Sequence, residues 1–197
     1  LTGVRDSVMM LAHQNFRVSH VTTHCALEDV PKKATAARIR RVVDLTHAAL
    51  VALGITDPRI AIAALNPHAG EGGIFGSHDI DITAPVVADY QAKGWRILGP
   101  VPGDTVFVKL RAGQYDAVIA MYHDQGHIPV KLLGFVIDPA TGTWTELSGV
   151  NVTLGLPIIR TSVDHGTAFD IAGRGVAQPS SLIEAIAYAQ YALTPQA

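Results

Sequence analysis

Residues 59–73 read RIAIAALNPHAGEGG, and residues 117–127 read AVIAMYHDQGH. Each stretch joins a short apolar run, typical of a strand buried on both faces of a sheet, to a polar segment that contains histidine. Patterns typical of amphipathic helices lie between and around these runs, which predicts an α/β fold with a largely parallel or mixed sheet. Ligands gather at the carboxyl ends of strands in such sheets, so we expect a binding site where the histidine segments lie.

The flanking segments alternate between the same two kinds of pattern. We expect helices at residues 7–14, 35–53, 82–93, 106–113 and 180–193, strands at residues 16–23 and 95–98, and a polar excursion or small hairpin at residues 136–148. A turn is expected at Gly99-Pro100. Because Gly126 and Pro129 disfavour a helix through His127, we predict a loop at residues 123–127 and reject a helical His-x-x-x-His metal motif.

Composition restricts the classes of protein to which the chain can belong. Of its 197 residues 48% are apolar and 16% are charged, which suits one globular domain or two small ones and excludes a disordered chain. The net charge of -2 gives no basic surface for nucleic acid. No apolar stretch approaches the roughly 20 residues of a membrane span, so we expect no membrane partner and a cytoplasmic location. The chain opens on Leu1 without an initiator Met, so we expect a piece of a longer protein or an incomplete gene product.

The nine histidines are the first candidates for chemistry, because imidazole titrates near neutrality and binds metals. His24, His68 and His123 each follow a predicted strand, and three nitrogen ligands with one open position describe a catalytic metal site. The alternative is three unrelated polar residues in loops. The single cysteine, Cys25, excludes an internal disulfide and a four-cysteine zinc site; it is either a nucleophile or an inert core residue.

Several further segments are candidates for binding an anion. Lys131, Asn151 and Arg160 lie in apolar contexts, where a charged side chain needs a partner or a ligand unless it is exposed at the edge of an element. Residues 70–76 contain four glycines, which let backbone N–H groups approach an anion, although a turn without a ligand has the same composition. Residues 164–175 form either a loop shaped around a planar or phosphorylated ligand or a turn followed by a short helix.

Four segments together resemble the 4-hydroxythreonine-4-phosphate dehydrogenase family, including its D-threonate/D-erythronate 4-phosphate dehydrogenase branch: VTTHCALEDVP, NPHAGEGGIFG, AMYHDQGHIPVKLLGF and GVNVTLGLPIIRTSVDHGTAFDIAGRG. The likeness runs from about residue 1 to residue 190 and covers the later part of that family's chain. It implies an isocitrate/isopropylmalate dehydrogenase-like two-domain fold, of which this chain is the C-terminal part, and an obligate homodimer. On this resemblance residues 1–148 form the metal- and dimer-forming domain, and residues 149–197 return to the cofactor-side domain.

The resemblance also implies which residues form the site. A divalent metal, usually zinc with magnesium or cobalt as alternatives, is expected on the residues that match His24, His68 and His123, contributed by both subunits of the homodimer. Asp124 lies beside a metal ligand and is expected to orient it or to relay a proton. Substrate contacts carry over to Lys131, Asn151 and Arg160, with Lys131 also catalytic. NAD or NADP is expected at a loop that lacks the Rossmann glycine fingerprint and comprises His165, Gly166, Thr167, Ala168 and Asp170.

The implied reaction is a metal-dependent oxidation by NAD, with decarboxylation, of a 4-phosphorylated hydroxy acid such as D-threonate or D-erythronate 4-phosphate to dihydroxyacetone phosphate. HDQGHIPVKLLGF and the excursion at residues 136–148 favour this branch over the alternative, the 4-hydroxythreonine-4-phosphate dehydrogenase of pyridoxal phosphate biosynthesis. NPHAGEGG and IRTSVDHG look less like relatives that oxidise dihydrodiol carboxylates. Two other classes stay open: a truncated remnant without dehydrogenase activity, and a metal-dependent hydrolase or aldolase.

Overall fold

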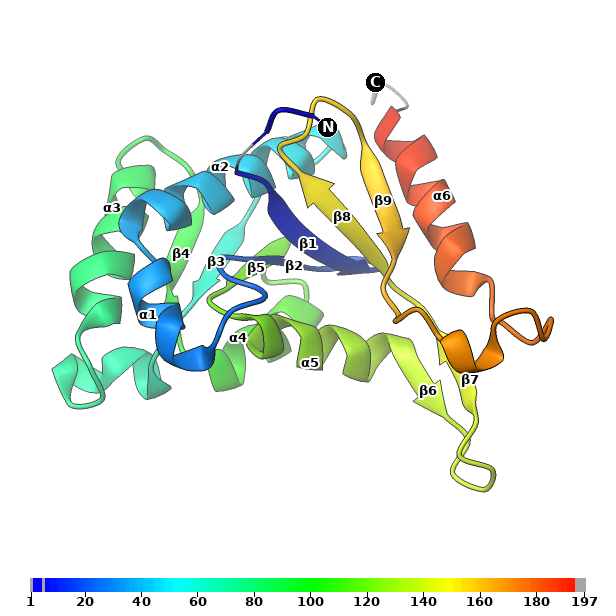
Figure 1. Cartoon of the computed structure of the whole chain (residues 1–197). Helices are drawn as coiled ribbons and strands as arrows, with labels where there is room; N and C mark the ends of the chain where they lie inside the picture. Colours follow the sequence, from blue (N-terminus) through cyan, green and yellow to red (C-terminus); the bar gives the residue numbers. More distant parts are fainter. Residues whose placement is uncertain (1, 5, 194–197) are drawn as a thin grey trace.

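The computed structural model describes residues 2–4 and 6–193 and confirms an α/β architecture on a seven-stranded mixed sheet. The strand order is β4–β3–β5–β2–β1–β8–β9 (Figure 1). The first four run parallel, β1 lies antiparallel between β2 and β8, and β9 is antiparallel to β8. The strands of this sheet span Val8–His13 (β1), Phe16–His20 (β2), Ile60–Ala63 (β3), Ile97–Val101 (β4), Ala117–Ala120 (β5), Val150–Leu154 (β8) and Arg160–Val163 (β9).

Helices cover both faces of the sheet. The core on one face takes side chains from α2 (Ala36–Ala52), α3 (Ala84–Gln91) and α6 (Ser180–Leu193), and the core on the other takes them from α4 (Gly103–Arg111) and α5 (His123–Gly134). Every residue of β3 and β5 is buried, with alternate residues entering the two cores, which explains their continuous apolar sequence. The predicted strands at these positions and the helices near residues 35–53, 82–93, 106–113 and 180–193 are confirmed.

The prediction of a helix at residues 7–14 is wrong, because this segment is β1. Met10 and Leu11 are both fully buried although they point to opposite faces of the sheet, so the apolar residues are adjacent rather than alternating. A contiguous apolar run of this length fits a buried strand as well as a buried helix. His13 pairs with Phe16 across a two-residue turn, in which Gln14 has a positive φ of 52°.

Two further predictions of local structure are corrected. Gly99-Pro100 is not a turn but lies within β4, an edge strand, where a residue without a backbone N–H is tolerated. The predicted loop at residues 123–127 is the first part of α5, which continues through Pro129. Gly126 does not break this helix; a Cβ there would lie 2.3 Å from Nε2 of His20, so the glycine lets α5 pack closely on β2.

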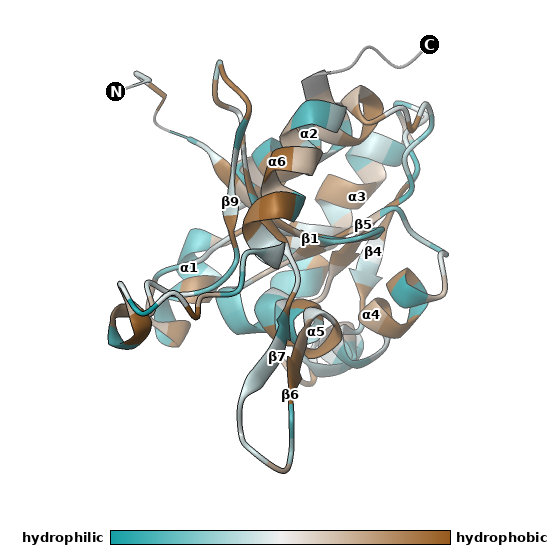
Figure 2. Ribbon diagram, turned by 90° about the vertical axis from the view of Figure 1, so that its right-hand side faces the viewer, coloured by the Kyte–Doolittle hydropathy of each residue, from teal (hydrophilic) through white to brown (hydrophobic). Residues whose placement is uncertain are grey.

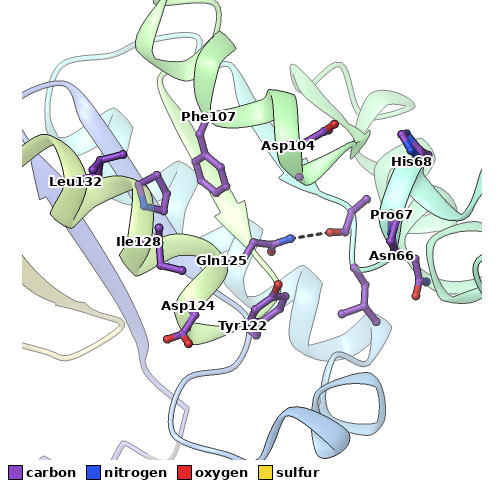
Figure 3. A pocket seen from close by; sticks show the side chains of 14 residues that line it. Asn66, Pro67, His68, Asp104, Phe107, Tyr122, Asp124, Gln125, Ile128 and Leu132 are labelled. Atoms are coloured by element: carbon purple, nitrogen blue, oxygen red, sulfur yellow. Dashed lines mark hydrogen bonds between the residues drawn. The ribbon is translucent and has the colours of Figure 1, made fainter.

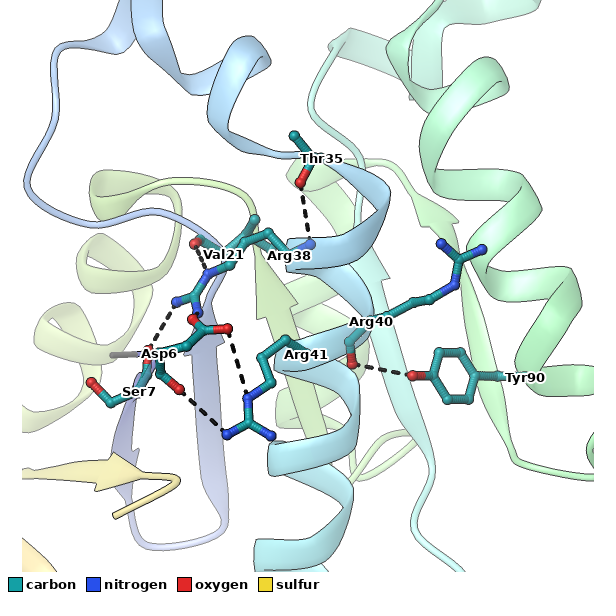
Figure 4. A network of polar contacts seen from close by, with 8 residues as sticks. All are labelled: Asp6, Ser7, Val21, Thr35, Arg38, Arg40, Arg41 and Tyr90. Carbon is teal, nitrogen blue, oxygen red and sulfur yellow. Dashed lines mark hydrogen bonds and ion pairs between the residues drawn. The ribbon is translucent and has the colours of Figure 1, made fainter. Parts of the chain in front are cut away.

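A polar network fixes α2 to the sheet on either side of the β1–β2 hairpin (Figure 4). The hydroxyl of Thr35 caps α2 by accepting from the backbone N–H of Arg38 at 3.2 Å. The Arg38 guanidinium donates to the carbonyl of Val21 at 2.9 Å and pairs with Asp6, which Arg41 also approaches. The segment that follows β2, with His24 in it, is therefore held at its start by α2.

The hairpin predicted as one reading of residues 136–148 is present as β6 (Phe135–Ile137) and β7 (Trp144–Leu147). It extends away from the body of the molecule below α5 (Figure 2). The predicted boundary between residues 148 and 149 falls between β7 and β8; the last residues of that second segment, 194–197, lie outside the described residues. Among the described helices, none has the length and apolar character needed to cross a membrane.

Candidate functional site

The carboxyl ends of β3, β5 and β2 lie side by side, because these strands are adjacent and parallel. His24 follows β2, and His123 follows β5 as the first residue of α5. Their ring centroids are 5.5 Å apart, and both side chains line a cavity of about 330 Å³ with Tyr122 and Asp124. Two imidazoles this close can reach one cation between them.

Asp124 sets the proton position on His123. Oδ1 of Asp124 lies 2.7 Å from Nδ1 of His123. An ionised carboxylate only accepts hydrogen bonds, so Nδ1 is the donor; in the neutral ring Nε2 then keeps the lone pair with which it can bind a metal. This geometry favours the orienting role that the sequence suggests for Asp124.

His68 does not join the other two histidines within one chain. It lines a separate cavity of about 570 Å³, which shares Tyr122 and Asp124 with the His24–His123 cavity. Figure 3 shows His68 and Asp124 on opposite sides of this cavity. Among the described residues, no three histidine, cysteine, aspartate or glutamate side chains of one chain are placed to hold a metal.

A strained turn carries His68. Residues 68–72 all have positive φ, and three of them, His68 (51°), Ala69 (55°) and Glu71 (41°), are not glycine. Such a run is rare for L-residues and is typical of functional loops that the surrounding structure holds in place. Gly70 is required by close packing, since a Cβ there would lie 2.6 Å from the carbonyl oxygen of Gly76.

Asp79 anchors the start of that turn. It is fully buried and accepts hydrogen bonds from the backbone N–H groups of Leu65 at 2.8 Å and Asn66 at 2.9 Å, and from the Asn66 side chain at 3.0 Å. Nearby, the side chain of Gln125 donates to the carbonyl of Ala64 and accepts from the backbone N–H of Met121. The ends of β3 and β5 and the start of α5 are therefore joined by hydrogen bonds.

Lys131 lies on α5 about two turns after His123 and lines a cavity of about 720 Å³. Its Nζ donates to the carbonyl of Asp164 at 2.7 Å, lies 3.5 Å from the Asp164 carboxylate and sits 4.3 Å from the centre of the Phe135 ring. Burial raises the pKa of the Asp164 carboxyl, and the Lys131 ammonium opposes that rise. The same cavity is lined by all of the predicted cofactor residues: His165, Gly166, Thr167, Ala168 and Asp170.

Asn151 and Arg160 lie on β8 and β9. Val150, Val152 and Leu154 of β8 enter the core beneath α2, so Asn151 points to the opposite face, where α5 lies. Its Nδ2 lies 3.3 Å from the sulfur of Met9, and its Oδ1 is buried without a hydrogen bond to any described residue. Arg160 is exposed and donates to the hydroxyl of Thr153 at 3.0 Å.

Two buried histidines lie behind this site: His127, which the predicted loop at residues 123–127 excluded from the site, and His20, which no sequence pattern pointed to. His127 stacks on His123 with ring centroids 3.6 Å apart, and His20 lies 4.7 Å behind His127. Burial, together with the neighbouring His127, lowers the pKa of His20 to about 3, and burial lowers the pKa of His127 to about 4. Both rings are therefore neutral near pH 7. The four-residue spacing of His123 and His127 would have indicated the contact of His127 with His123 if a helix had been predicted there.

Residues 1–189 match the family of the pyridoxal phosphate biosynthetic protein PdxA. Over 190 residues the chain is 73% identical to the "Putative D-threonate 4-phosphate dehydrogenase" of Bradyrhizobium diazoefficiens, covering 96% of this chain and 55% of that protein. It is 51% identical over 187 residues to the 4-hydroxythreonine-4-phosphate dehydrogenase of Beijerinckia indica, covering 95% of this chain and 52% of that one.

A solved structure extends the likeness to the fold. The crystal structure of 4-hydroxythreonine-4-phosphate dehydrogenase from Klebsiella pneumoniae matches with a TM-score of 0.83 at 45% identity, covering 98% of this chain and 55% of that one. The fold is thus of the isocitrate/isopropylmalate dehydrogenase-like type. The chain spans about half the length of the relatives it matches.

Proposed function

Because the chain belongs to the family of the pyridoxal phosphate biosynthetic protein PdxA, we propose that it forms part of a dehydrogenase that oxidises a 4-phosphorylated hydroxy acid with NAD or NADP. The observation that carries the proposal is the 720 Å³ cavity, in which Lys131 faces the loop of residues 165–170. A lysine beside a glycine-containing loop suits a ligand that carries phosphate or carboxylate groups. D-threonate or D-erythronate 4-phosphate is the preferred substrate, oxidised and decarboxylated to dihydroxyacetone phosphate, because the relative with 73% identity is named for D-threonate 4-phosphate.

His24 and His123 of one protomer and His68 of its partner would hold the divalent metal, with zinc preferred. The close His24–His123 pair and the Asp124 carboxylate on Nδ1 of His123 fit such an ion, and the separation of His68 within one chain suits a site completed by a second copy. When bound, the cation would act as a Lewis acid on a substrate oxygen. On this proposal residues 1–148 carry the metal site and the dimer contacts, and residues 149–197 belong to the cofactor side.

The chain's own residues bind and orient the substrate. Lys131 and Arg160 neutralise its anionic groups, and the unpaired Oδ1 of Asn151 can accept a hydrogen bond from a substrate hydroxyl. Asp164 holds Lys131 in place through its carbonyl and carboxylate. Residues 165–168 and Asp170 hold the nicotinamide cofactor against this end of α5.

The test is absorbance in the NADH band, with zinc or magnesium, NAD, and each candidate 4-phosphate in turn. A signal with D-threonate or D-erythronate 4-phosphate supports the proposal. A signal with 4-hydroxythreonine 4-phosphate alone moves the protein to the second candidate, which the 51% identical Beijerinckia relative favours. Metal binding without a signal from any of these substrates overturns the assigned reaction.

The shared metal site is tested by mixing His68→Ala and His123→Ala protomers after each has been shown to be inactive. Random exchange gives one intact site in half of the dimers, so about one quarter of the wild-type activity is expected to return if each site takes residues from both copies. No recovery on mixing, with exchange of subunits verified by mass, rejects a shared site.

A further inference from the structure

Four histidine rings form a continuous line from the interior to the candidate metal site. The ring centroids of His20 and His127 are 4.7 Å apart, and those of His123 and His24 are 5.5 Å apart. Between these pairs, His127 stacks on His123 with a centroid distance of 3.6 Å and an angle of 11° between the ring planes. His20 is fully buried and His127 is 8% exposed. The proposed function uses the outer two rings and assigns nothing to the inner two.

Hydrogen bonds fix the inner rings from behind. Nδ1 of His127 lies 2.8 Å from the carbonyl oxygen of His123, one helical turn earlier, so this nitrogen donates. Nδ1 of His20 lies 3.3 Å from the carbonyl of Met9 on the neighbouring strand, and Nε2 of His20 is closed off against Gly126. The His127 ring is thus held between a rigid sheet residue and the face of His123.

The position of His127 along α5 connects the two halves of the site. His123, His127 and Lys131 are spaced four residues apart, so they lie on one side of the helix. One turn before His127 is the candidate metal ligand, and one turn after it is the candidate substrate lysine. Asp124 restrains His123 through one hydrogen bond at Nδ1, between two exposed side chains, and the stacked ring of His127 adds a restraint on the face of the imidazole.

We infer that His127, supported by His20, is a positioning residue that holds the imidazole of His123 at the angle required to bind a divalent cation. This inference rests on the proposed function and deepens it. The stacked face of His127 restrains rotation of the His123 ring about its side-chain bonds, while Asp124 fixes its proton. Two restraints on one ring would preorganise the ligand before the metal arrives.

Binding of Co²⁺ to the protein tests the inference, with the visible absorption of the ion as a readout of ligand geometry. His127→Leu is expected to weaken Co²⁺ binding by about 10–100-fold and to change the spectrum. His127→Phe keeps a flat ring against His123, so its affinity and spectrum are expected to stay close to those of the wild type. This rescue separates loss of the stacked face from loss of the His127 hydrogen bond.

His47→Leu is the matched control, because His47 also stacks on an aromatic ring, that of Trp95 at 3.7 Å, on another part of the chain. Its Co²⁺ affinity is expected to be unchanged. Wild-type affinity and spectrum in His127→Leu, or equal losses in His127→Leu and His47→Leu, would overturn the inference. Wild-type protein that binds no Co²⁺, or that binds it equally after His123→Ala, would instead overturn the metal site in the proposed function.

Discussion

Replacing Gly126 by alanine should destabilise the fold, although alanine is the better helix former. The added Cβ would lie 2.3 Å from Nε2 of His20 and 2.9 Å from Cγ1 of Val18, and both of these side chains are fully buried on β2. Overpacking of this kind costs about 1–3 kcal/mol, and two clashes against a central strand place it near the upper end. Alanine regains about 1 kcal/mol of helix propensity, which leaves a net loss of about 2 kcal/mol.

Thermal unfolding followed by circular dichroism measures this loss. For a chain of this size, about 2 kcal/mol corresponds to a Tm lower by about 4–8 °C. Gly166→Ala is the control, because a Cβ at Gly166 meets nothing within 4 Å. In the double variant with His20→Ala the methyl group meets no ring, so the combined loss should be smaller than the sum of the two single losses. A Gly126→Ala protein that melts at or above the wild-type temperature would refute the packing argument.

Three other predictions concern carboxylates. Asp124→Asn should weaken Co²⁺ binding by about 10–100-fold, because a neutral amide accepts a weaker hydrogen bond from Nδ1 of His123 and can instead present its NH₂ group to that nitrogen; unchanged affinity in a Co²⁺ titration would contradict this. Asp79→Ala leaves the partly buried backbone donors of Leu65 and Asn66 without their acceptor, so urea unfolding should show a free energy of unfolding lower by about 1–3 kcal/mol, whereas no loss would mean that water replaces the carboxylate. Burial raises the pKa of Asp116, but hydrogen bonds from Arg59 outweigh burial and lower it overall. The contribution of Asp116 to stability is therefore complete above the unfolded-state pKa of about 4 and is lost as the pH falls through the lower folded pKa. When the free energy of unfolding is measured with urea between pH 6 and pH 2, Asp116→Asn should reduce its dependence on pH in that range.

The parts of the fold that the sequence predicts are those that local pattern determines. The apolar runs of β3 and β5 are buried on both faces, and α2 has a broad apolar stripe with a capping threonine at residue 35. The predictions of local structure are wrong where contacts with residues distant in the sequence determine it. β1 is a strand because β2 and β8 lie on either side of it. Helix α5 passes through Gly126 and Pro129 because the glycine fits against His20, a residue more than 100 positions away.

The same division applies to the candidate site. The tendency of ligands to bind at the carboxyl ends of parallel strands is enough to predict that His24 and His123 come together, because β2 and β5 are parallel neighbours. It does not predict where His68 points, since that depends on a strained turn held by Asp79, 11 residues further along the chain. No pattern in the residues predicts that Lys131 and the loop of residues 165–170 line one cavity; the family resemblance implies a substrate role for the first and a cofactor role for the second, without predicting that they meet.

The geometry of α5 sets the spacing between the two halves of the proposed site. His123 and Lys131 are eight residues apart on one side of the helix, which corresponds to about 12 Å along its axis. Because this separation is fixed by helical geometry and not by a loop, a shift of α5 moves the candidate metal ligand and the candidate substrate lysine together. Gly126, between them, is where α5 is packed onto the sheet, so an alanine there should reduce the affinity for Co²⁺ as well as the Tm.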